Sequence, residues 1–125
     1  MAKNEFKTEM ELMNAVRLAL AEKNIISFRV NVGKVKTEDG RWFDTGLPKG
    51  FSDVMALTPN GQTCFIETKQ HPRRPTKEQI NFMLAMIGRG CPSGVAYTVQ
   101  DALDIVRWDL DTRVNMVNKL RGYYD

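Results

Sequence analysis

This sequence has few of the residues and segments that several common kinds of site require. Its two cysteines, Cys64 and Cys91, stand alone, without a CxxC or Cys/His pattern, so neither a zinc site nor dependence on disulfides is expected. No stretch approaches the roughly 20 apolar residues of a membrane span. The first residues are partly acidic and lack the apolar core of a secretion signal. These absences predict an intracellular, cytoplasmic protein without a membrane segment.

The residues that are present have the composition of an ordinary globular protein. The 125 residues are 42% hydrophobic and 26% charged, which suits one domain with its own core and is too short for two. The net charge of +3 is too small to identify a polyanionic partner, so the distribution of charge matters more than its sum. We expect residues 1–125 to form a single domain.

Hydrophobic spacing and turn residues predict an alternation of helices and strands. Residues 8–23 have the spacing of a helix, with Thr8 as the N-cap and Glu11 completing a capping box. The further expected elements are a strand at 25–32, an irregular hairpin or flexible loop at 33–50, an antiparallel hairpin of strands at 51–57 and 62–69, a helix at 76–89, a strand at 94–99, and helices at 100–106 and 110–123. This order predicts an α/β domain with a central mixed sheet flanked by helices.

Two carboxylates and an ammonium group are expected to meet at one end of this sheet. Glu67 and Lys69 occupy alternate positions of one strand, so their side chains point the same way, about 7 Å apart along the strand. The hairpin partner carries Asp53, whose carboxylate can come beside Glu67. Hard divalent cations prefer such oxygen ligands, and a nearby lysine can position a water and offset charge on a phosphate. The three residues are a candidate site for hydrolysing a phosphodiester.

An alternative interpretation is that Glu67 and Lys69 form a surface charge pair, because Glu-x-Lys is a short pattern that often occurs by chance. Phe65 and Ile66 directly precede this pattern, and such apolar residues are typical of a buried strand. Charges at the end of a buried strand need partners, because an unpaired buried charge is costly. The residues by themselves leave both interpretations open.

Three short segments, taken in order, are similar to those of a known nuclease family. Gly50–Asp53, Phe65–Lys69 and Thr76–Gln79 together resemble the VRR-NUC branch of the PD-(D/E)XK nuclease superfamily. The resemblance extends from about Glu9 to Val106 and departs from many relatives at Ser52, where they carry proline. It implies a restriction-endonuclease-like core with the element order αβββαβ, in which the whole chain is one VRR-NUC nuclease domain.

The resemblance also implies a role for each matching residue. Asp53 and Glu67 would bind Mg²⁺ or Mn²⁺ directly, and the backbone carbonyl of Thr68 would be a further metal ligand. Lys69 would act on the attacking water and on the phosphate that is cut. Gln79 would hydrogen-bond within the catalytic site and help to place the substrate or the water.

Two further implied roles have alternatives. A glutamate on the first helix often completes the metal shell through water in this superfamily, and Glu9 and Glu11 both compete for that role. Glu9 is preferred as the catalytic and metal-binding glutamate, because Glu9–Leu12 resembles the start of archaeal-type junction-resolving enzymes. Gln79 stands three residues after Thr76, which fits a capping box in which the Gln79 side chain bonds back to the amide of Thr76. The cap and the catalytic role of Gln79 remain alternative hypotheses.

Basic residues outside the candidate site suit the phosphate backbone of DNA. Arg73, Arg74 and Lys77 lie in a segment without acidic residues, and Lys34 and Lys36 lie in the glycine-rich insertion. Arginine can bind a phosphate through two parallel hydrogen bonds. The alternative for all five residues is that they are solvated loop residues.

Three other side chains have two possible interpretations each. His71, the single histidine, could contact a phosphate or relay a proton, although a loop histidine before proline is more often simply exposed. Trp42 and Phe43 in the insertion could anchor it to the core or cover a partner subunit.

The first functional hypothesis is a metal-dependent endonuclease that selects branched DNA such as a Holliday junction, as small stand-alone relatives do. Cutting a two-fold junction needs two symmetric active sites, which implies at least a homodimer. The resemblance and the compact length favour a protein of a phage or mobile element. The alternatives are flap or end processing, general DNA cleavage, and a non-catalytic DNA-binding module of the same fold.

Overall fold

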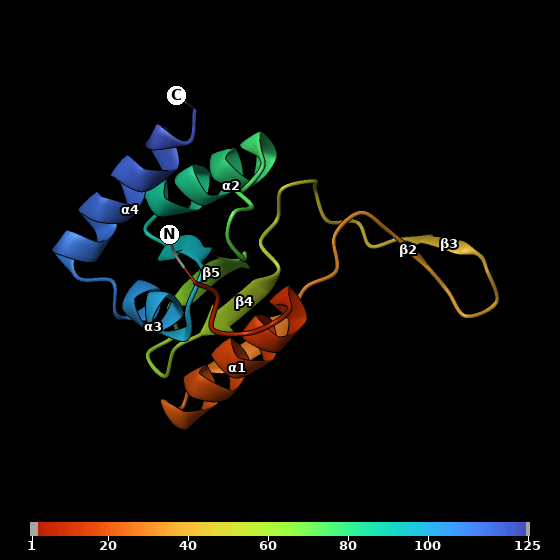
Figure 1. Cartoon of the computed structure of the whole chain (residues 1–125), viewed down its shortest axis with the longest axis horizontal. Helices are drawn as coiled ribbons and strands as arrows, with labels where there is room; N and C mark the ends of the chain where they lie inside the picture. The colour runs from red at the N-terminus through yellow and green to blue at the C-terminus, as the bar shows by residue number, and fades with distance from the viewer. Residues whose placement is uncertain (1–2, 125) are drawn as a thin grey trace.

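The architecture follows the order of elements that the sequence predicts. The structure is a computed structural model that describes residues 3–124. In these residues the elements are α1 (Glu9–Glu22), β1 (Ile26–Arg29), β2 (Lys34–Lys36), β3 (Trp42–Asp44), β4 (Val54–Leu57), β5 (Thr63–Thr68), α2 (Lys77–Gly88), β6 (Ser93–Ala96), α3 (Val99–Arg107) and α4 (Leu110–Gly122), as Figure 1 shows. Each predicted helix and strand is present, with small shifts of its ends. None of the helices in residues 3–124 has the length and apolar character needed to cross a membrane.

Four strands form the central sheet, in the order β1-β4-β5-β6. β1 pairs with β4 and β4 with β5 in the antiparallel direction, whereas β5 and β6 are parallel. The β4–β5 hairpin closes with a turn in which the Gly61 N–H donates to the Thr58 carbonyl at 2.9 Å, which confirms the hairpin expected over 51–69. A parallel pair needs a crossover connection, and α2 supplies it between β5 and β6. The sheet is therefore mixed, as predicted.

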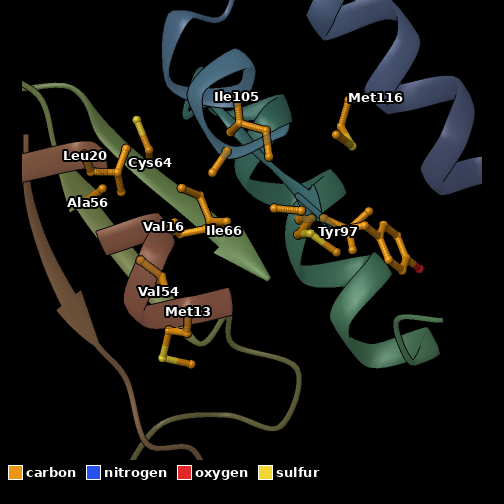
Figure 2. Close-up of a cluster of buried hydrophobic side chains, with 14 of the residues drawn as sticks. Met13, Val16, Leu20, Val54, Ala56, Cys64, Ile66, Tyr97, Ile105 and Met116 are labelled. Atoms are coloured by element: carbon orange, nitrogen blue, oxygen red, sulfur yellow. The ribbon is translucent and has the colours of Figure 1, made fainter. Parts of the chain in front are cut away.

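Helices cover both faces of this sheet (Figure 1). Val16 of α1 is buried in one hydrophobic core with Ala56 of β4 and Ile66 of β5, as Figure 2 shows at close range. Phe65 points to the opposite face from Ile66, because strand side chains alternate. There it packs against Phe82 of α2, with ring centroids 5.2 Å apart. The α/β architecture expected from the sequence is confirmed.

The first helix begins at the predicted cap, with one difference in its hydrogen bonds. Thr8 Oγ1 accepts a hydrogen bond from the Glu11 N–H at 3.1 Å, so Thr8 is the N-cap of α1. The reciprocal bond of a capping box, from the Thr8 amide to the Glu11 carboxylate, is absent among the hydrogen bonds of residues 3–124. The predicted capping box of α1 is therefore only half formed.

Residues 33–46 form an arm that projects from the body of the protein (Figure 1). Within the arm, β2 and β3 pair antiparallel as a separate two-stranded sheet, which confirms the irregular hairpin expected at 33–50. Trp42 and Phe43 are 68% and 60% exposed. Because both side chains face solvent, they do not anchor the arm to the core, which was one of the two roles considered for them.

Candidate active site

Three predicted site residues converge where β4 begins and β5 ends. Glu67 lies in β5, Lys69 directly follows this strand, and Asp53 directly precedes β4. The Lys69 Nζ lies 3.9 Å from Glu67 Oε2, and the amide of Asp53 donates to Glu67 Oε1 at 3.2 Å. The side chains of Glu67 and Lys69 thus share one face, and the pairing of β4 with β5 brings Asp53 to them.

The carboxylate of Asp53 is oriented by Thr68. Asp53 Oδ1 accepts a hydrogen bond from the Thr68 backbone N–H at 3.0 Å, and Asp53 Oδ2 accepts one from the Thr68 hydroxyl at 2.6 Å. Hydrogen bonds to an ionised acceptor are stronger than those between neutral groups, so both oxygens have a defined position. From the sequence, only the backbone carbonyl of Thr68 was expected to take part in the site; its amide and its hydroxyl group were not predicted to orient Asp53.

Gly50 and Phe51 determine how the chain enters β4. A Cβ atom on Gly50 would lie 2.5 Å from the backbone oxygen of Glu78, and the φ of Gly50 is +97°, so glycine is required for the chain to pass this close to α2. Phe51 packs against Phe82 of α2, with ring centroids 4.7 Å apart. These two contacts hold the segment that leads to Asp53 against the first turns of α2.

Gln79 uses its two amide atoms for two different purposes. Its Oε1 accepts a hydrogen bond from the Thr76 N–H at 2.8 Å, and Thr76 Oγ1 accepts one from the Gln79 N–H at 3.2 Å, which completes a capping box. Its Nε2 donates to Glu67 Oε2 at 3.2 Å. The cap and the contact within the site, which the sequence analysis treated as alternatives, are therefore formed by one side chain at once.

Burial and like charge make this place unfavourable for two ionised carboxylates. Glu67 is 4% exposed, and burial together with the neighbouring charge of Asp53 raises the pKa of its carboxyl group. Burial also raises the pKa of Asp53, against the lowering effect of the hydrogen bonds from Thr68. Lys69 is likewise 4% exposed and offsets one of the two negative charges. When both carboxylates are ionised, the ammonium group of Lys69 balances one of them and the other negative charge stays uncompensated within the group.

The oxygen atoms of this group fit a hard divalent cation. Mg²⁺ typically takes one or two protein carboxylates and keeps several waters, and Asp53 and Glu67 supply two carboxylates beside the backbone of Thr68. Within residues 3–124, no group of three or more His, Cys, Asp or Glu side chains is gathered closely enough to hold a metal ion. Glu9 is therefore not grouped with the two carboxylates as a third direct ligand.

Glu9, in the first turn of α1, lies near the site but has another partner. Its carboxylate forms an ion pair with Arg73, and its charge adds to those that raise the pKa of Asp53 and of Glu67. Glu11 is exposed. Of the two glutamates considered from the sequence, the structure places Glu9 within electrostatic reach of the two carboxylates.

A cleft of about 330 Å³ opens beside the carboxylates. Asp53 and Glu67 line it together with Arg29, at the end of β1, and Lys49, in the loop before β4. Arg29 enters none of the ion pairs formed within residues 3–124, whereas Lys49 Nζ lies 3.8 Å from Glu78 Oε1. Neither cation was predicted from the sequence as part of the site. Arg29 reaches the cleft because β1 pairs with β4, which no local pattern reveals.

The predicted DNA-binding residues fall into two groups. Arg73, Arg74 and Lys77 are exposed and lie between the end of β5 and the first residue of α2, next to the residues that line the cleft. Lys34 and Lys36 are exposed on β2 of the arm, which extends away from the sheet (Figure 1). Only the first group adjoins the candidate active site.

His71 has contacts that account for its position without a role in chemistry. Its ring stacks on Tyr97, with centroids 4.1 Å apart. Its backbone N–H donates to Asn4 Oδ1 at 2.9 Å, and Asn4 Nδ2 donates back to the His71 carbonyl at 3.0 Å. These contacts tie the loop after β5 to the N-terminal segment, so a structural role explains His71.

The arrangement of helices and strands is similar to that of a solved structure. No protein-family profile matches the sequence, and no curated protein matches it either. A solved structure described as "VRR_NUC domain" matches with a TM-score of 0.58 and 15% sequence identity, over 79% of this chain and 94% of that one. At this identity the match establishes the arrangement of the chain in space and leaves its activity open. The protein therefore has the fold of a VRR_NUC domain, as the resemblance of its sequence segments predicted.

Proposed function

We propose that this chain, over residues 1–125, is a single metal-dependent DNA nuclease domain. The observation that carries the proposal is the buried group of Asp53, Glu67 and Lys69, in which two carboxylates face one ammonium group beside a cleft. A surface charge pair does not explain this burial. The similarity in fold to a VRR_NUC domain supports the same conclusion.

The metal would be held by the carboxylates of Asp53 and Glu67, by the backbone carbonyl of Thr68, and through water by Glu9. Mg²⁺ or Mn²⁺ in this position supplies a Lewis acid for the phosphate and lowers the pKa of water. Its positive charge would also balance the carboxylates that burial now disfavours in their ionised form.

The other residues orient and balance this group. The Lys69 ammonium, 3.9 Å from Glu67, would donate hydrogen bonds to the attacking water and to an oxygen of the phosphate. Gln79 holds one oxygen of Glu67 through its Nε2, and Thr68 holds both oxygens of Asp53. Such fixed donors and acceptors contribute to catalysis because they need no rearrangement when charge develops on the phosphate.

Cations around the cleft would bind the DNA backbone. Arg29 and Lys49 line the cleft, and Arg73, Arg74 and Lys77 lie beside it. A row of cations is needed there, because two carboxylates would otherwise repel the phosphates of a nucleic acid.

We propose branched DNA, such as a Holliday junction, as the preferred substrate, cut by at least two copies of the chain. A two-fold junction presents two equivalent strands, which two symmetric active sites would cut. Flap or end processing and general duplex cleavage use the same chemistry. A panel of labelled four-way, flapped and linear DNAs separates these substrates by their relative rates.

The decisive experiment is cleavage of supercoiled plasmid and of a labelled four-way junction with Mg²⁺ or Mn²⁺. We expect nicking by the wild type and none by Asp53→Ala. Lys69→Met should also lose cleavage while it keeps most of its DNA binding. If the wild type does not nick either DNA and equals Asp53→Ala, the chain is a DNA-binding module without catalysis. Normal cleavage by Lys69→Met would refute the role given to the lysine.

A further inference from the structure

A column of stacked side chains stands beside the candidate active site. The ring of His71 lies on the ring of Tyr97, with centroids 4.1 Å apart and planes inclined by 12°. The ammonium group of Lys119 lies 5.0 Å from the centroid of the same Tyr97 ring. Because the imidazole already covers one face of Tyr97, the ammonium group occupies the other. The three groups therefore form layers, with the imidazole at one end of the column.

Tyr97 gives this column a fixed position. It is 5% exposed, and Figure 2 shows it at the margin of the hydrophobic cluster, with its hydroxyl pointing away from the other labelled side chains. This hydroxyl donates to the Arg73 carbonyl at 2.8 Å and lies 3.3 Å from the hydroxyl of Tyr123. Asn4 bonds to the main chain of His71 from the other side. The imidazole is thus held in place without a ligand, and a surface ordered in advance loses less entropy on binding.

The outer face of the imidazole is open to solvent. His71 is exposed although Tyr97 covers one face of its ring, so the exposed part lies on the far side and the edges of the ring. Within residues 3–124, no second aromatic ring stacks on it. A flat ring with one supported face and one open face is the surface on which proteins that bind single strands stack a nucleobase.

The column lies next to Lys69 at the edge of the sheet. β5 and β6 are parallel and end at the same edge, where the Lys69 N–H donates to the Ala96 carbonyl at 3.0 Å. Lys69 and Tyr97 directly follow these two strands, which lie about 4.8 Å apart. His71 comes two residues after Lys69, at most about 7 Å along the chain, which is roughly two nucleotides at about 3.4 Å each. A DNA strand that passes Lys69 can therefore reach the column with a neighbouring nucleotide.

The charges around the column favour a nucleic acid. Arg74, whose guanidinium lies 6.0 Å from the ring centroid of Tyr123, and Lys119 are both exposed. Neither enters any of the ion pairs formed within residues 3–124. The nearby carboxylate of Asp101 is engaged by the main chain, because it accepts a hydrogen bond from the Tyr97 N–H at 2.9 Å. Two such cations beside an open aromatic surface combine phosphate attraction with base stacking, as sites for single strands do.

We propose that an unpaired base of branched DNA stacks on the outer face of the His71 ring, while Arg74 and Lys119 hold phosphates next to it. Bases without a stacking neighbour occur at the branch point of junctions, flaps and forks, whereas a base in a continuous duplex must first be unpaired and unstacked. The site therefore favours branched over linear DNA. It rests on the proposed function in one respect, that the chain binds DNA at the neighbouring cleft.

The first test compares a labelled forked DNA, in which two unpaired arms follow a duplex, with a fully paired duplex of the same length. Binding is titrated in EDTA, so that neither DNA is cut. We expect the wild type to bind the fork at least about five-fold more tightly, which is the lower end for stacking one base. In His71→Ala the ratio of the two affinities should fall to about one, whereas His71→Phe, which keeps a flat ring, should retain the preference.

The matched control is Trp42→Ala, which removes an exposed aromatic side chain from the arm and should retain the preference for the fork. Thermal melting shows whether each variant is folded. Equal binding of both DNAs by the wild type, or a preference that His71→Ala retains, overturns the proposal. Loss of the preference in His71→Phe as well would assign the effect to the polar atoms of the imidazole, which also overturns base stacking.

The second test changes the DNA and leaves the protein intact. Each unpaired nucleotide of the fork is replaced in turn by an abasic nucleotide, which keeps the phosphate and removes the base. We expect one position at which this replacement weakens wild-type binding about as much as His71→Ala does, and at which it has no further effect on His71→Ala. If the two losses multiply at every position, no base contacts His71 and the proposal is wrong.

The phosphate contacts are tested by the salt dependence of binding to the fork. Arg74→Ala and Lys119→Ala should each reduce the slope of log affinity against log salt by about 1. The control is Arg113→Ala, because Arg113 lies on the same helix as Lys119 but lines the groove between α4 and α2. Its slope should equal that of the wild type. The same change of slope in all three variants would contradict the placement of phosphates beside the column.

The nuclease and the stacking site can fail separately, because binding is measured without metal and without cleavage. A wild type that prefers the fork through His71 but nicks no DNA refutes the nuclease and leaves the stacking site. A wild type that nicks DNA and binds the fork and the duplex equally refutes the stacking site and leaves the nuclease.

Discussion

The cleft and the arm depart from ordinary protein structure in opposite ways. In the cleft, Glu67 and Lys69 are charged yet only 4% exposed each, whereas on the arm Trp42 and Phe43 are apolar yet 68% and 60% exposed. Folded proteins mostly bury apolar side chains and leave charged ones in water. Both exceptions are costly, because a buried charge loses its water and an exposed apolar side chain stays in contact with it. In the cleft, two buried carboxylates lie beside one ammonium group, and on the arm two aromatic side chains are open to water.

The two regions also differ in how firmly the rest of the chain holds them. In the cleft, Thr68 orients Asp53, Gln79 holds Glu67, and Phe51 packs against α2. The arm is held by contacts within itself, which include the ladder between β2 and β3 and the ion pair of Arg41 with Asp39 in its turn. A site held by its own neighbours can be ready before its ligand binds.

The largest expected effect comes from Asp53→Asn, which keeps the shape of the side chain and removes its charge. Cleavage should fall at least about 100-fold, which is the scale for removing one group that stabilises a transition state. The metal-free protein should at the same time become more resistant to heat, because one of two crowded carboxylates is gone. Cleavage rates and melting curves measure the two effects. Asp111→Asn, which removes an exposed carboxylate from α4, should change neither. A loss of both activity and stability in Asp53→Asn would argue against buried like charges.

The dependence of stability on pH tests the same group without DNA. The pKa values of Asp53 and Glu67 are raised in the folded protein, so the folded state keeps protons that the unfolded chain releases. This contribution is complete below the ordinary carboxyl pKa of about 4 and is lost as the pH rises through the raised values. Metal-free protein should therefore lose stability to urea above that range, and saturating Mg²⁺ should remove much of this loss. The slope should be smaller in Asp53→Asn. Metal-free stability that rises through this range would contradict the assignment.

The double use of Gln79 predicts a difference between two neighbouring substitutions. Thr76→Ala removes the helix cap alone and should cost about 1 kcal/mol of stability, with cleavage nearly unchanged. Gln79→Ala removes the reciprocal cap bond and the hydrogen bond to Glu67 together, so it should lower stability by a similar amount and also slow cleavage. Urea unfolding and single-turnover rates separate the two. If both variants cleave DNA at the same rate, the side chain of Gln79 serves only as part of the helix cap and its hydrogen bond to Glu67 does not contribute to cleavage.

The smallest expected effect belongs to the cations of the cleft. Arg29→Ala should weaken DNA binding several-fold at moderate salt and reduce the slope of log affinity against log salt by about 1, as expected for one lost phosphate contact. Arg89→Ala is the matched control, because Arg89 is exposed at the end of α2 and donates to the Ala85 carbonyl. Binding titrations at several salt concentrations measure both. If Arg89→Ala shows the same change of slope, the effect of Arg29→Ala comes from the loss of one positive charge and not from the position of Arg29 in the cleft.

Much of the site could be foreseen, because its parts are close in the sequence. Side chains alternate along an extended chain, so Glu67 and Lys69 point to the same face. The tight turn between the two strands then brings Asp53 back beside them. Arg29 and Lys49 could not be found in this way, because they reach the cleft from other segments. For the same reason, the ion pair that occupies Glu9 with Arg73 could not be foreseen.

The sequence by itself determined the helices and strands of this protein, the N-caps Thr8 and Thr76 and the turn between β4 and β5, because each depends on residues within a few positions of one another. It also placed Asp53, Glu67 and Lys69 at one end of the sheet. Only the tertiary structure decided that Gln79 serves both the helix start and Glu67, that Gly50 passes against α2, and that the arm stands free with Trp42 exposed. These features depend on how separate segments pack, and packing is set by strand order and helix placement over the whole chain.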